Sequence, residues 1–383
     1  MQSQDRLKAI IIGGGIGGIT TAIALRQAGI DATVYERAPE LREVGSGLPL
    51  FTNALKALQK LGLGDKIEAL GEHANTLSVS TWRGQVLTDV TNEKHLQSLG
   101  TVSTVVHRAE LLALLVETLG MENVHLNAEC TGFTQGESGV RARFVGGMEV
   151  QGDFLVGADG LHSTIRSQMY GIIKPAYVGY TTWRGVAHIE RSGLERYVWG
   201  KGYQFGVAPM SKGRAYWFAQ KYAPEGQPDK AGGRKQELLD LFHDWHDPVP
   251  AVIEATRDAD ILRNDVYELP HLKRWSSGRV TLLGDAAHAM TPNLGQGGCL
   301  AIEDALVLAD CLAKEQHNVV AALKLYETRR IKRTRNVARL AHLMAGAVQI
   351  ENNALAGTRN AIFKRVPPSF VVKRVLWILD YKV

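Results

Sequence analysis

Short apolar runs that end in glycine recur three times along the chain. Each has the length of a strand buried on both faces, and they cover Lys8–Ile12, Phe154–Gly157 and Arg279–Leu283. After the first run, apolar positions with helical spacing continue from Ile19 to Gln27 and stop at Gly29. Ala32–Tyr35 then forms a second strand-like run. The pattern predicts a βαβ unit at the start of the chain, with the two later runs in the same discontinuous domain.

In the middle of the chain the period of the pattern changes to two. Alternating stretches cover Gly179–Ile189, Gly202–Pro209 and Arg214–Tyr222, and Leu77–Leu87 is expected to add a further strand. These stretches predict an antiparallel sheet with one face toward a ligand and the other toward helices or water. Thr182 and Arg184 share one face and Trp183 lies on the other. Alternation alone does not tell which face meets the ligand.

Together these elements predict an α/β fold, or α+β when the whole chain is considered. A Rossmann-like domain carries an inserted antiparallel sheet, and C-terminal helices follow. The Rossmann-like domain is expected to comprise residues 1–70, 101–173 and 271–330. Residues 71–100 and 174–270 would form the substrate-binding sheet, and residues 331–383 a C-terminal helical segment.

The glycine-rich stretch after the first strand, GGGIGG at positions 13–18, fits the pattern G-x-G-x-x-G. Gly13 permits the tight turn, Gly15 lets a pyrophosphate approach the backbone, and Gly18 lets the helix pack on the strand. The N-terminus of that helix offers unpaired N–H groups to phosphates. Glu36, at the end of the second strand, can accept both ribose hydroxyls. We expect dinucleotide contacts from Gly13, Gly15, Ile16, Gly18, Glu36 and Arg37, and the motif does not choose between NAD and FAD.

Charge and composition narrow the class of protein. The net charge of the chain is +5. The segment from Arg329 to the last residue contains twelve Lys or Arg and two acids, so its net charge is +10. The first 328 residues therefore carry a net charge of −5. The chain as a whole therefore does not have the charge pattern of a nucleic-acid binder. The three cysteines show no metal-ligand spacing and suit a reducing, cytoplasmic compartment. We expect no signal peptide, no membrane span and no metal site.

Two later motifs indicate which protein family the chain resembles. The first is GADG at positions 157–160, followed by Ser163 and Arg166, and the second is GDAAHAMTPNLGQGG at positions 284–298. With GGGIGG, they make the chain resemble the para-hydroxybenzoate hydroxylase family of FAD-dependent monooxygenases. Salicylate, urate and alkylquinolone hydroxylases and zeaxanthin epoxidase are the closer relatives. The resemblance extends over nearly the whole chain.

The resemblance implies roles for several residues around FAD. Asp285 would bond the ribityl chain, and Gly295, Gln296, Gly297 and Gly298 would carry the pyrophosphate and the flavin edge. Asp159 would link FAD and the nicotinamide, and the carbonyl of Pro292 would lie near the flavin. Arg108 would lie along the FAD, or else act as a surface residue that caps a helix. Gly47 belongs to an apolar segment, Gly45–Ala54, that would pass beside the flavin ring as a loop.

The resemblance also implies the reaction. NADH or NADPH docks transiently and reduces FAD, O2 adds to the flavin, and the C4a-hydroperoxide delivers one oxygen atom to a small aromatic or apolar substrate. The alternative is an FAD-dependent reductase or dehydrogenase of the same fold, such as a prenyl-chain reductase. His288 is expected to hold the loop rather than to act as a base. Urate hydroxylases have an arginine near Gln204, so this chain is expected to lack that anchor for an anionic purine.

Substrate contacts are expected from the alternating sheet. Arg184 and Tyr216 are candidates for catalysis because they could orient an anion, and Gln204, Phe205 and Phe218 for substrate binding. Ordinary sheet packing is the alternative for each of these residues.

The C-terminal region is basic and helical. A helix around residues 327–347 is expected to place Ile331, Val337, Leu340 and Leu343 on one apolar face. Phe370–Val383 would either dock as a helix on the FAD domain or make weak peripheral contact with a membrane. We expect a monomer or a homodimer.

Overall fold

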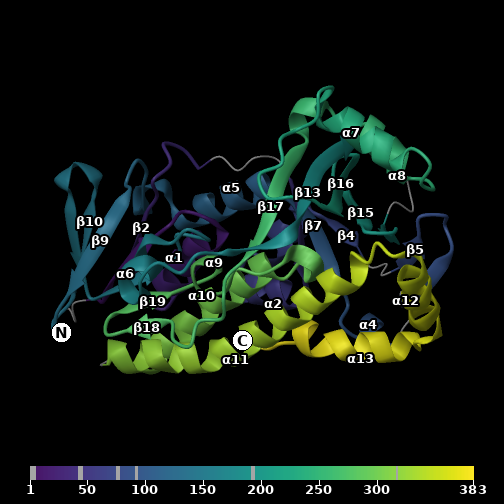
Figure 1. Cartoon of the computed structure of the whole chain (residues 1–383). Helices are drawn as coiled ribbons and strands as arrows, with labels where there is room; N and C mark the ends of the chain where they lie inside the picture. Colours follow the sequence, from purple (N-terminus) through teal and green to yellow (C-terminus); the bar gives the residue numbers. More distant parts are fainter. Residues whose placement is uncertain (1–5, 42–45, 75–77, 91–93, 191–194, 316–317) are drawn as a thin grey trace.

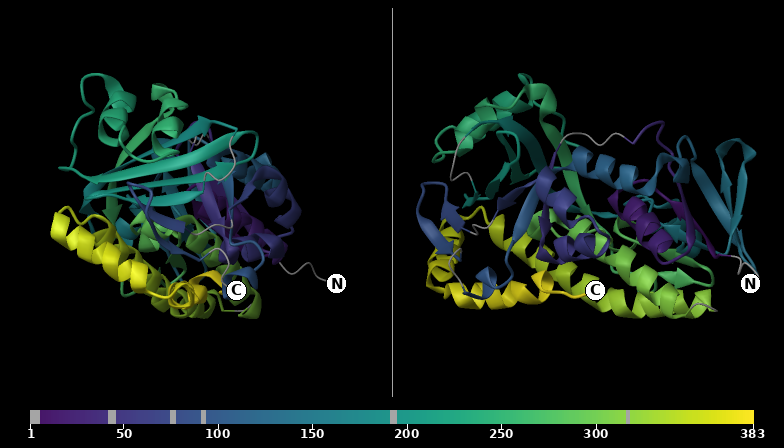
Figure 2. Two further views of the ribbon diagram at one scale, coloured as in Figure 1. Left: turned by 90° about the vertical axis from the view of Figure 1, so that its right-hand side faces the viewer. Right: turned by 180° about the vertical axis from the view of Figure 1, so that it is seen from behind.

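The computed structural model describes residues 6–41, 46–74, 78–90, 94–190, 195–315 and 318–383. Gly45 and Leu77, which were expected to begin two of the segments above, lie outside these ranges. The described residues form two β-structures that lie side by side, with long C-terminal helices running along one side of both (Figures 1 and 2).

The first structure is a mainly parallel sheet. Its strands follow in the order β18 (Ser276–Ser277), β19 (Val280–Leu282), β12 (Phe154–Gly157), β1 (Lys8–Ile12), β2 (Asp31–Tyr35) and β8 (Val124–His125). Only the β18–β19 pair among these is antiparallel. The inner strands are apolar without alternation because helices cover one face and a small antiparallel sheet lies against β1 on the other. The expected βαβ unit is thus confirmed.

Helices pack around this sheet and form the main core with it. Helix α1 (Ile16–Gln27) lies between α10 (Gly297–Lys314) and α5 (Arg108–Leu119), which explains why it is apolar on almost every side. Further elements of this half are α2 (Thr52–Lys60), α3 (Gly64–Leu70), η1 (Met121–Asn123), α6 (Thr164–Tyr170), α9 (Asp285–His288) and η4 (Pro292–Leu294). The small antiparallel sheet has the order β11 (Glu149–Gly152), β10 (Val140–Phe144) and β9 (Cys130–Gln135), with η2 (Val145–Gly147) beside it.

The second structure is the predicted alternating sheet. Its strands follow in the order β17 (Leu262–Glu268), β13 (Ala176–His188), β16 (Arg214–Tyr222), β15 (Tyr203–Met210), β14 (Arg196–Trp199), β5 (Ser78–Thr81) and β6 (Val86–Asp89). Helices α7 (Gly233–Phe242) and α8 (Val249–Glu254), with η3 (Asp258–Asp260), belong to its outer side. The stretch expected as one strand near residues 77–87 is a hairpin, β5–β6, because Gly84 adopts a positive φ and the chain turns there.

Three expectations about boundaries differ from the structure. The segment beside the glycine turns is a strand, β3 (Gly47–Phe51), rather than a loop, and it pairs with β7 (Ser103–His107). Strand β4 (Glu72–Ala74), expected in the substrate-binding sheet, also pairs with β7. The domain boundary expected at residue 331 falls inside α11 (Val319–Val348), which is one helix.

The C-terminal helices join the two halves. After α11 come α12 (Asn353–Arg365) and α13 (Pro368–Leu379), while α4 (Lys94–Gln97) lies near α13 (Figure 1). Of the expected apolar face of α11, Ile331, Val337 and Leu340 do pack inward, whereas Leu343 is 69% exposed. Arg330 and Arg333 are buried on the same helix, so polar contacts add to the apolar periodicity on its inward side. Within the described ranges, no helix is long and apolar enough to cross a membrane.

Candidate functional site

The turn from β1 into α1 shows why three glycines are needed. A Cβ on Gly13, whose φ is +113°, would lie 2.3 Å from the carbonyl oxygen of Ala158, and a Cβ on Gly18 would lie 1.9 Å from that of Gly13. By contrast, no described atom outside the chain neighbours lies within 4 Å of a Cβ on Gly15. Gly13 and Gly18 therefore hold the turn closed, whereas Gly15 leaves open space at the N-terminus of α1. The side chain of Ile16 lies in the core, so only its backbone can serve a ligand.

Glu36 lies at the end of β2, close to this turn. Its Oε2 accepts a hydrogen bond of 2.6 Å from the backbone N of Gly14, and its Oε1 accepts one of 2.9 Å from Ala38. The carboxylate is thus held against the glycine turn, where a ribose next to a pyrophosphate would lie. The neighbouring Arg37 is exposed.

The late glycine motif forms a second turn of the same kind. Strand β19 leads through Gly284 and α9 into η4, where the carbonyl of Pro292 accepts a hydrogen bond of 2.8 Å from the N of Gly295. Gly295 has a φ of +63° and precedes α10, which begins at Gly297. Gly298 faces Leu48, and Asp285 is exposed beside Gly297.

Helices α1 and α10 pack closely, since a Cβ on Gly17 would lie 3.2 Å from the Cβ of Ala301. Neither helix has a side-chain cap at its N-terminus among the described residues. Two sets of unpaired backbone N–H groups therefore lie at neighbouring helix ends, which is the arrangement that binds a pyrophosphate.

Asp159 lies beside the first turn, because β12 pairs with β1. Its Oδ2 accepts a hydrogen bond of 3.2 Å from the N of Ile165, while its Oδ1 is buried without a hydrogen-bond partner in the described part of the chain. Burial raises the pKa of Asp159, and the bonds from Ser163 and Ile165 only partly oppose this. A buried acceptor without a partner indicates that a ligand donor completes the site.

One face of the alternating sheet is turned toward these turns. On it lie Arg184, Tyr216, Phe218 and Gln204, and a Cβ on Gly47 would lie 2.3 Å from Cγ of Tyr216. The glycine at position 47 is thus required for β3 to pass beneath the tyrosine ring. Phe218 lies over Gly206 in the same way.

Charged groups from both halves meet at this face. Burial and the nearby Arg184 lower the pKa of Arg108, while Asp285 and Tyr216 raise it. Burial raises the pKa of Tyr216, and Arg184 and Arg108 oppose this. The Nη2 of Arg184 donates a hydrogen bond of 2.7 Å to Oδ1 of Asn264. Arg108, Arg184, Tyr216 and Asp285, which are distant in sequence, therefore share one electrostatic environment.

Phe205 does not belong to this group. Its side chain is 0% exposed on the opposite face of the sheet, where it stacks on Trp217 at 5.5 Å and contacts Phe242 of α7 edge-on. Its neighbour Gln204 points the other way because successive residues of a strand alternate between faces. The prediction of Phe205 as a substrate contact is therefore wrong, and the ordinary packing alternative holds for it.

Sequence reasoning missed a polar link between the sheet and η4. The hydroxyl of Tyr180 donates a hydrogen bond of 2.7 Å to Asn293, whose Nδ2 donates one of 3.2 Å to Gln220. Gln220 is paired with Gln204 across β15 and β16, and it lies two positions after Phe218 on the same strand. Alternation along β16 could have placed Gln220 on the ligand face, but no local pattern identifies its contact with Asn293.

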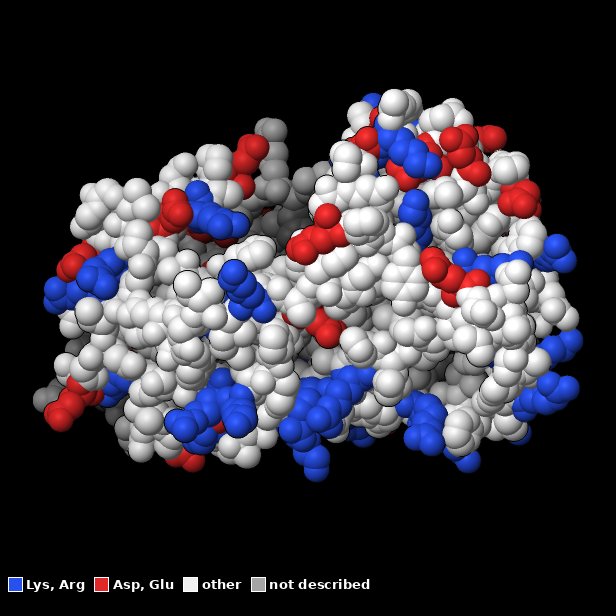
Figure 3. Space-filling model, in the orientation of Figure 1, with Lys and Arg blue, Asp and Glu red and all other residues white. Residues whose placement is uncertain are grey.

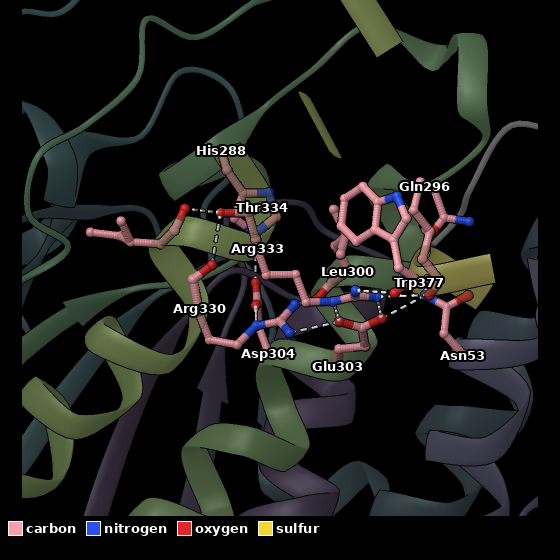
Figure 4. A network of polar contacts seen from close by, with 12 residues as sticks. Asn53, His288, Gln296, Leu300, Glu303, Asp304, Arg330, Arg333, Thr334 and Trp377 are labelled. Carbon is pink, nitrogen blue, oxygen red and sulfur yellow. Dashed lines mark hydrogen bonds and ion pairs between the residues drawn. The ribbon is translucent and has the colours of Figure 1, made fainter. Parts of the chain in front are cut away.

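A buried ionic network behind the late motif was also missed (Figure 4). Glu303 of α10 pairs with Arg330 and Arg333 of α11 at 2.6 Å and accepts a hydrogen bond of 2.6 Å from Asn53. The same Asn53 amide donates to the side chain of Gln296, at a distance of 3.0 Å. The network therefore connects the C-terminal helices to Gln296, the residue directly before α10.

His288 belongs to the second half of this network. Its Nε2 lies 2.6 Å from Oδ2 of Asp304, whose Oδ1 accepts a hydrogen bond of 2.6 Å from Arg330. Burial alone would raise the pKa of Asp304, but Arg330 and His288 hold it below its usual value. His288 thus has an acid partner, but this acid is fully buried and bound to arginine. Its ring holds α9 on α10, as the loop-holding role requires.

The residues present fit an FAD molecule. Two uncapped helix ends, the open space at Gly15 and the unpartnered oxygen of Asp159 are what a dinucleotide with two phosphates requires. No group of three or more His, Cys, Asp or Glu in the described ranges is arranged to hold a metal ion.

Comparison with known proteins gives concordant results. The profile of the FAD binding domain family matches residues 6–341. The aurachin C monooxygenase/isomerase of Stigmatella aurantiaca is 40% identical over 361 residues, or 94% of each chain. An FAD-dependent urate hydroxylase of Klebsiella pneumoniae is 33% identical over 337 residues, or 86% of this chain and 88% of that protein.

A solved structure shows the same architecture. The structure of Klebsiella pneumoniae HpxO complexed with FAD and uric acid superposes with a TM-score of 0.90 at 29% identity. The superposition covers 97% of this chain and 96% of that one. The similarity therefore includes both glycine turns, the alternating sheet and the C-terminal helices.

Proposed function

Because the chain belongs to the FAD binding domain family, we propose that it is an FAD-dependent monooxygenase that uses NADH or NADPH and O2 to insert one oxygen atom into a small aromatic or apolar substrate. The observation that carries the proposal is the convergence of two uncapped helix ends and Asp159 at the ligand face of the sheet. The relatives reported above are a monooxygenase and a hydroxylase, which favours oxygen insertion over the reductase alternative.

The residues that would hold FAD come from three parts of the chain. The N-terminus of α1 with Gly15, and that of α10 with Gly297 and Gly298, would face the pyrophosphate. Glu36 would hold the adenosine ribose, and Asp285 the ribityl chain. When bound, FAD would supply the redox chemistry of the reaction. In that chemistry NAD(P)H is the reductant, one oxygen atom of O2 goes to the substrate and the other leaves as water.

The sheet face would bind and orient the substrate. The hydroxyl of Tyr216 is protonated at neutral pH, as any tyrosine is, and burial raises its pKa further, so it can donate a hydrogen bond. Arg184 can orient an oxygen that carries negative charge. Phe218 and the apolar side chain of Leu48 would exclude water from the reacting atoms.

Gln204 would give the site a neutral polar contact. It is 5% exposed, and its Oε1 has no hydrogen-bond partner in the described ranges. A buried amide of this kind favours a substrate with a neutral N–H or O–H group on an apolar body. We propose further that the protein acts in the cytoplasm as a monomer or homodimer, with only peripheral membrane contact through its C-terminal tail.

The first test measures flavin content and oxygen use. Purified protein should be yellow, and its oxidation of NADH or NADPH should require O2 and accelerate with phenols, quinolones or indoles. The product mass should increase by one oxygen atom. A colourless protein that takes up no added FAD, or turnover that proceeds equally well without O2, would remove the proposal.

A pair of neighbouring variants tests the ligand face. Gln204→Leu should raise KM by roughly tenfold, because the substrate loses one buried hydrogen bond. Phe205→Leu, the matched control on the opposite face, should lower the melting temperature and leave KM unchanged. Equal KM changes in the two variants would place the substrate elsewhere.

A further inference from the structure

One side of the C-terminal helix α13 packs on the core, and the opposite side is exposed. The inner side of α13 contacts the core through Val372, Ile378 and Leu379, so the expectation of docking on the FAD-binding half is supported. On the outer side, Phe370 and Trp377 are 49% and 42% exposed. Two turns separate them, so they share one stripe of the helix.

Cations lie between these two aromatic rings. Lys373 and Arg374 are both exposed, and the guanidinium carbon of Arg374 lies 5.0 Å from the centre of the Phe370 ring. Asp380, the nearby acid, is bound to Lys56 at 2.7 Å. The outer side of α13 therefore combines aromatic and cationic groups, the composition of a helix that lies in a membrane interface.

The two preceding helices extend this composition. Of the twelve large apolar side chains that are exposed in the described ranges, five lie between residues 343 and 377: Leu343, Leu355, Ile362, Phe370 and Trp377. Exposed cations accompany them at Lys332, Arg339, Lys364, Arg365, Lys373, Arg374 and Lys382. Figure 3 shows Lys and Arg gathered along the lower edge of the molecule, over α11 and α13.

We propose that this surface, the exposed apolar and basic side chains of α11, α12 and α13, docks the protein on an anionic lipid bilayer. The inference deepens the peripheral contact proposed above and does not depend on the oxygenase chemistry. Its excess of positive charge complements anionic headgroups, each cation near the surface adding modestly to binding. Protein interfaces are depleted in lysine, and nucleic-acid affinity comes mainly from phosphate contacts, which leave a row of exposed apolar side chains without a role, so a bilayer is the occupant that fits best.

The experiment uses the full-length flavin-loaded protein and vesicles of phosphatidylcholine, with or without about a third phosphatidylglycerol. Co-sedimentation should show binding to the anionic vesicles only. The bound fraction should fall strongly between about 0.1 M and about 1 M salt, where the screening length drops from about 10 to about 3 Å. Failure to bind anionic vesicles, or equal binding to neutral ones, would overturn the proposal.

A matched pair of double variants tests whether this surface is the part of the protein that binds the vesicles. Phe370→Ser with Arg374→Glu should weaken vesicle binding about tenfold, since one ring is lost and one charge is reversed. The control is Val145→Ser with Arg143→Glu on the β10–β11 hairpin, where Val145 is 61% exposed and Arg143 is exposed. It should bind as the unchanged protein does. Equal losses of vesicle binding in the two double variants would refute the assignment. A change from dimer to monomer in the Phe370 and Arg374 variant would refute it as well, because it would identify a second copy of the chain as the occupant of this surface.

Flavin content and NAD(P)H oxidation in the absence of vesicles serve as the fold control. Both should be the same in the two double variants, because all four positions lie outside the proposed FAD site. Loss of vesicle binding with unchanged flavin content supports the lipid surface. A colourless but vesicle-binding protein would contradict the proposed function and leave the lipid surface intact.

Discussion

Gly13, Gly15 and Gly18 lie within one turn of the chain, yet an added side chain would meet something different at each. At Gly13 and Gly18 it would collide with backbone carbonyls, and at Gly15 it would enter open space. Two of these glycines are therefore needed by the fold itself, and the third leaves open space where the proposed phosphate would lie. The same division appears between Gln204 and Phe205, adjacent residues of which only the first faces the site.

This division predicts opposite outcomes for two substitutions. Gly15→Val should leave the melting temperature of the flavin-free protein unchanged, because Gly15 is in an extended conformation that valine adopts. Its dissociation constant for FAD should rise by about tenfold or more, since the methyl groups occupy the phosphate position. Gly18→Val should cost about 3 kcal/mol or prevent folding. Fluorescence titration with FAD measures the first effect, and normal FAD affinity in Gly15→Val would contradict the assignment.

At the scale of elements, α10 contributes both to the proposed FAD site and to the contact with the C-terminal helices. Its N-terminus faces the proposed pyrophosphate, and about two turns later Glu303 and Asp304 bind two arginines of α11 in a buried network. Arg333 also donates to the carbonyls of Trp377 and Ile378, which ties α13 to the same carboxylate. The position of α10 relative to its neighbours is therefore set by charge as well as by apolar packing.

Removal of one charge from this network should be costly. Glu303→Gln leaves a buried arginine charge uncompensated and should lower the free energy of unfolding by about 3–5 kcal/mol. Glu149→Gln, which removes an acid from the exposed pair with Arg141, should leave it nearly unchanged. Denaturant unfolding of the two variants at equal flavin occupancy provides the comparison. Similar midpoints for both would show that the buried network contributes little.

At the scale of the whole molecule, α11 unites the two halves. Its first turns pack in the core of the FAD-binding half through Leu323 and Tyr326, and its last turns contact the alternating sheet through Ala345 and Val348. Helix α13 then returns to the FAD-binding half. The C-terminal region is thus part of the common core rather than an appendage.

Truncation should consequently affect the whole fold. A chain that ends at Val366 lacks α13, exposes the core side chains that Val372, Ile378 and Leu379 cover, and leaves Arg333 without two carbonyl acceptors. Its melting temperature should fall by about 5 °C or more. The Phe370→Ser and Arg374→Glu double variant, altered only on the outer side of α13, should melt as the unchanged protein does. Unchanged melting of the shortened chain would mean that α13 is not part of the core.

The sequence by itself determined the features that depend on short-range patterns. The βαβ unit with its glycine turn, the uncapped helix ends, the alternating strands and the order of the three motifs all follow from spacing within a few residues. Such spacing carries information because a helix or strand imposes its own period on buried positions. For this reason the parallel sheet, the antiparallel sheet and the glycine turn before α1 could be proposed before any coordinates, whereas the FAD contacts proposed for Asp159 and Asp285 came from the resemblance to the hydroxylase family.

Only the tertiary structure decided which face of the alternating sheet meets the site, because both faces of that sheet are covered. Phe205 and Gln204 are equally buried, and only the position of α7 separates their roles. The network around Glu303 joins Asn53, Arg330 and Arg333 across 250, 27 and 30 positions. Buried ion pairs have no periodicity of their own, so the apolar pattern of α11 did not indicate that Arg330 and Arg333 are buried. Contacts over such distances form only when the whole chain has folded.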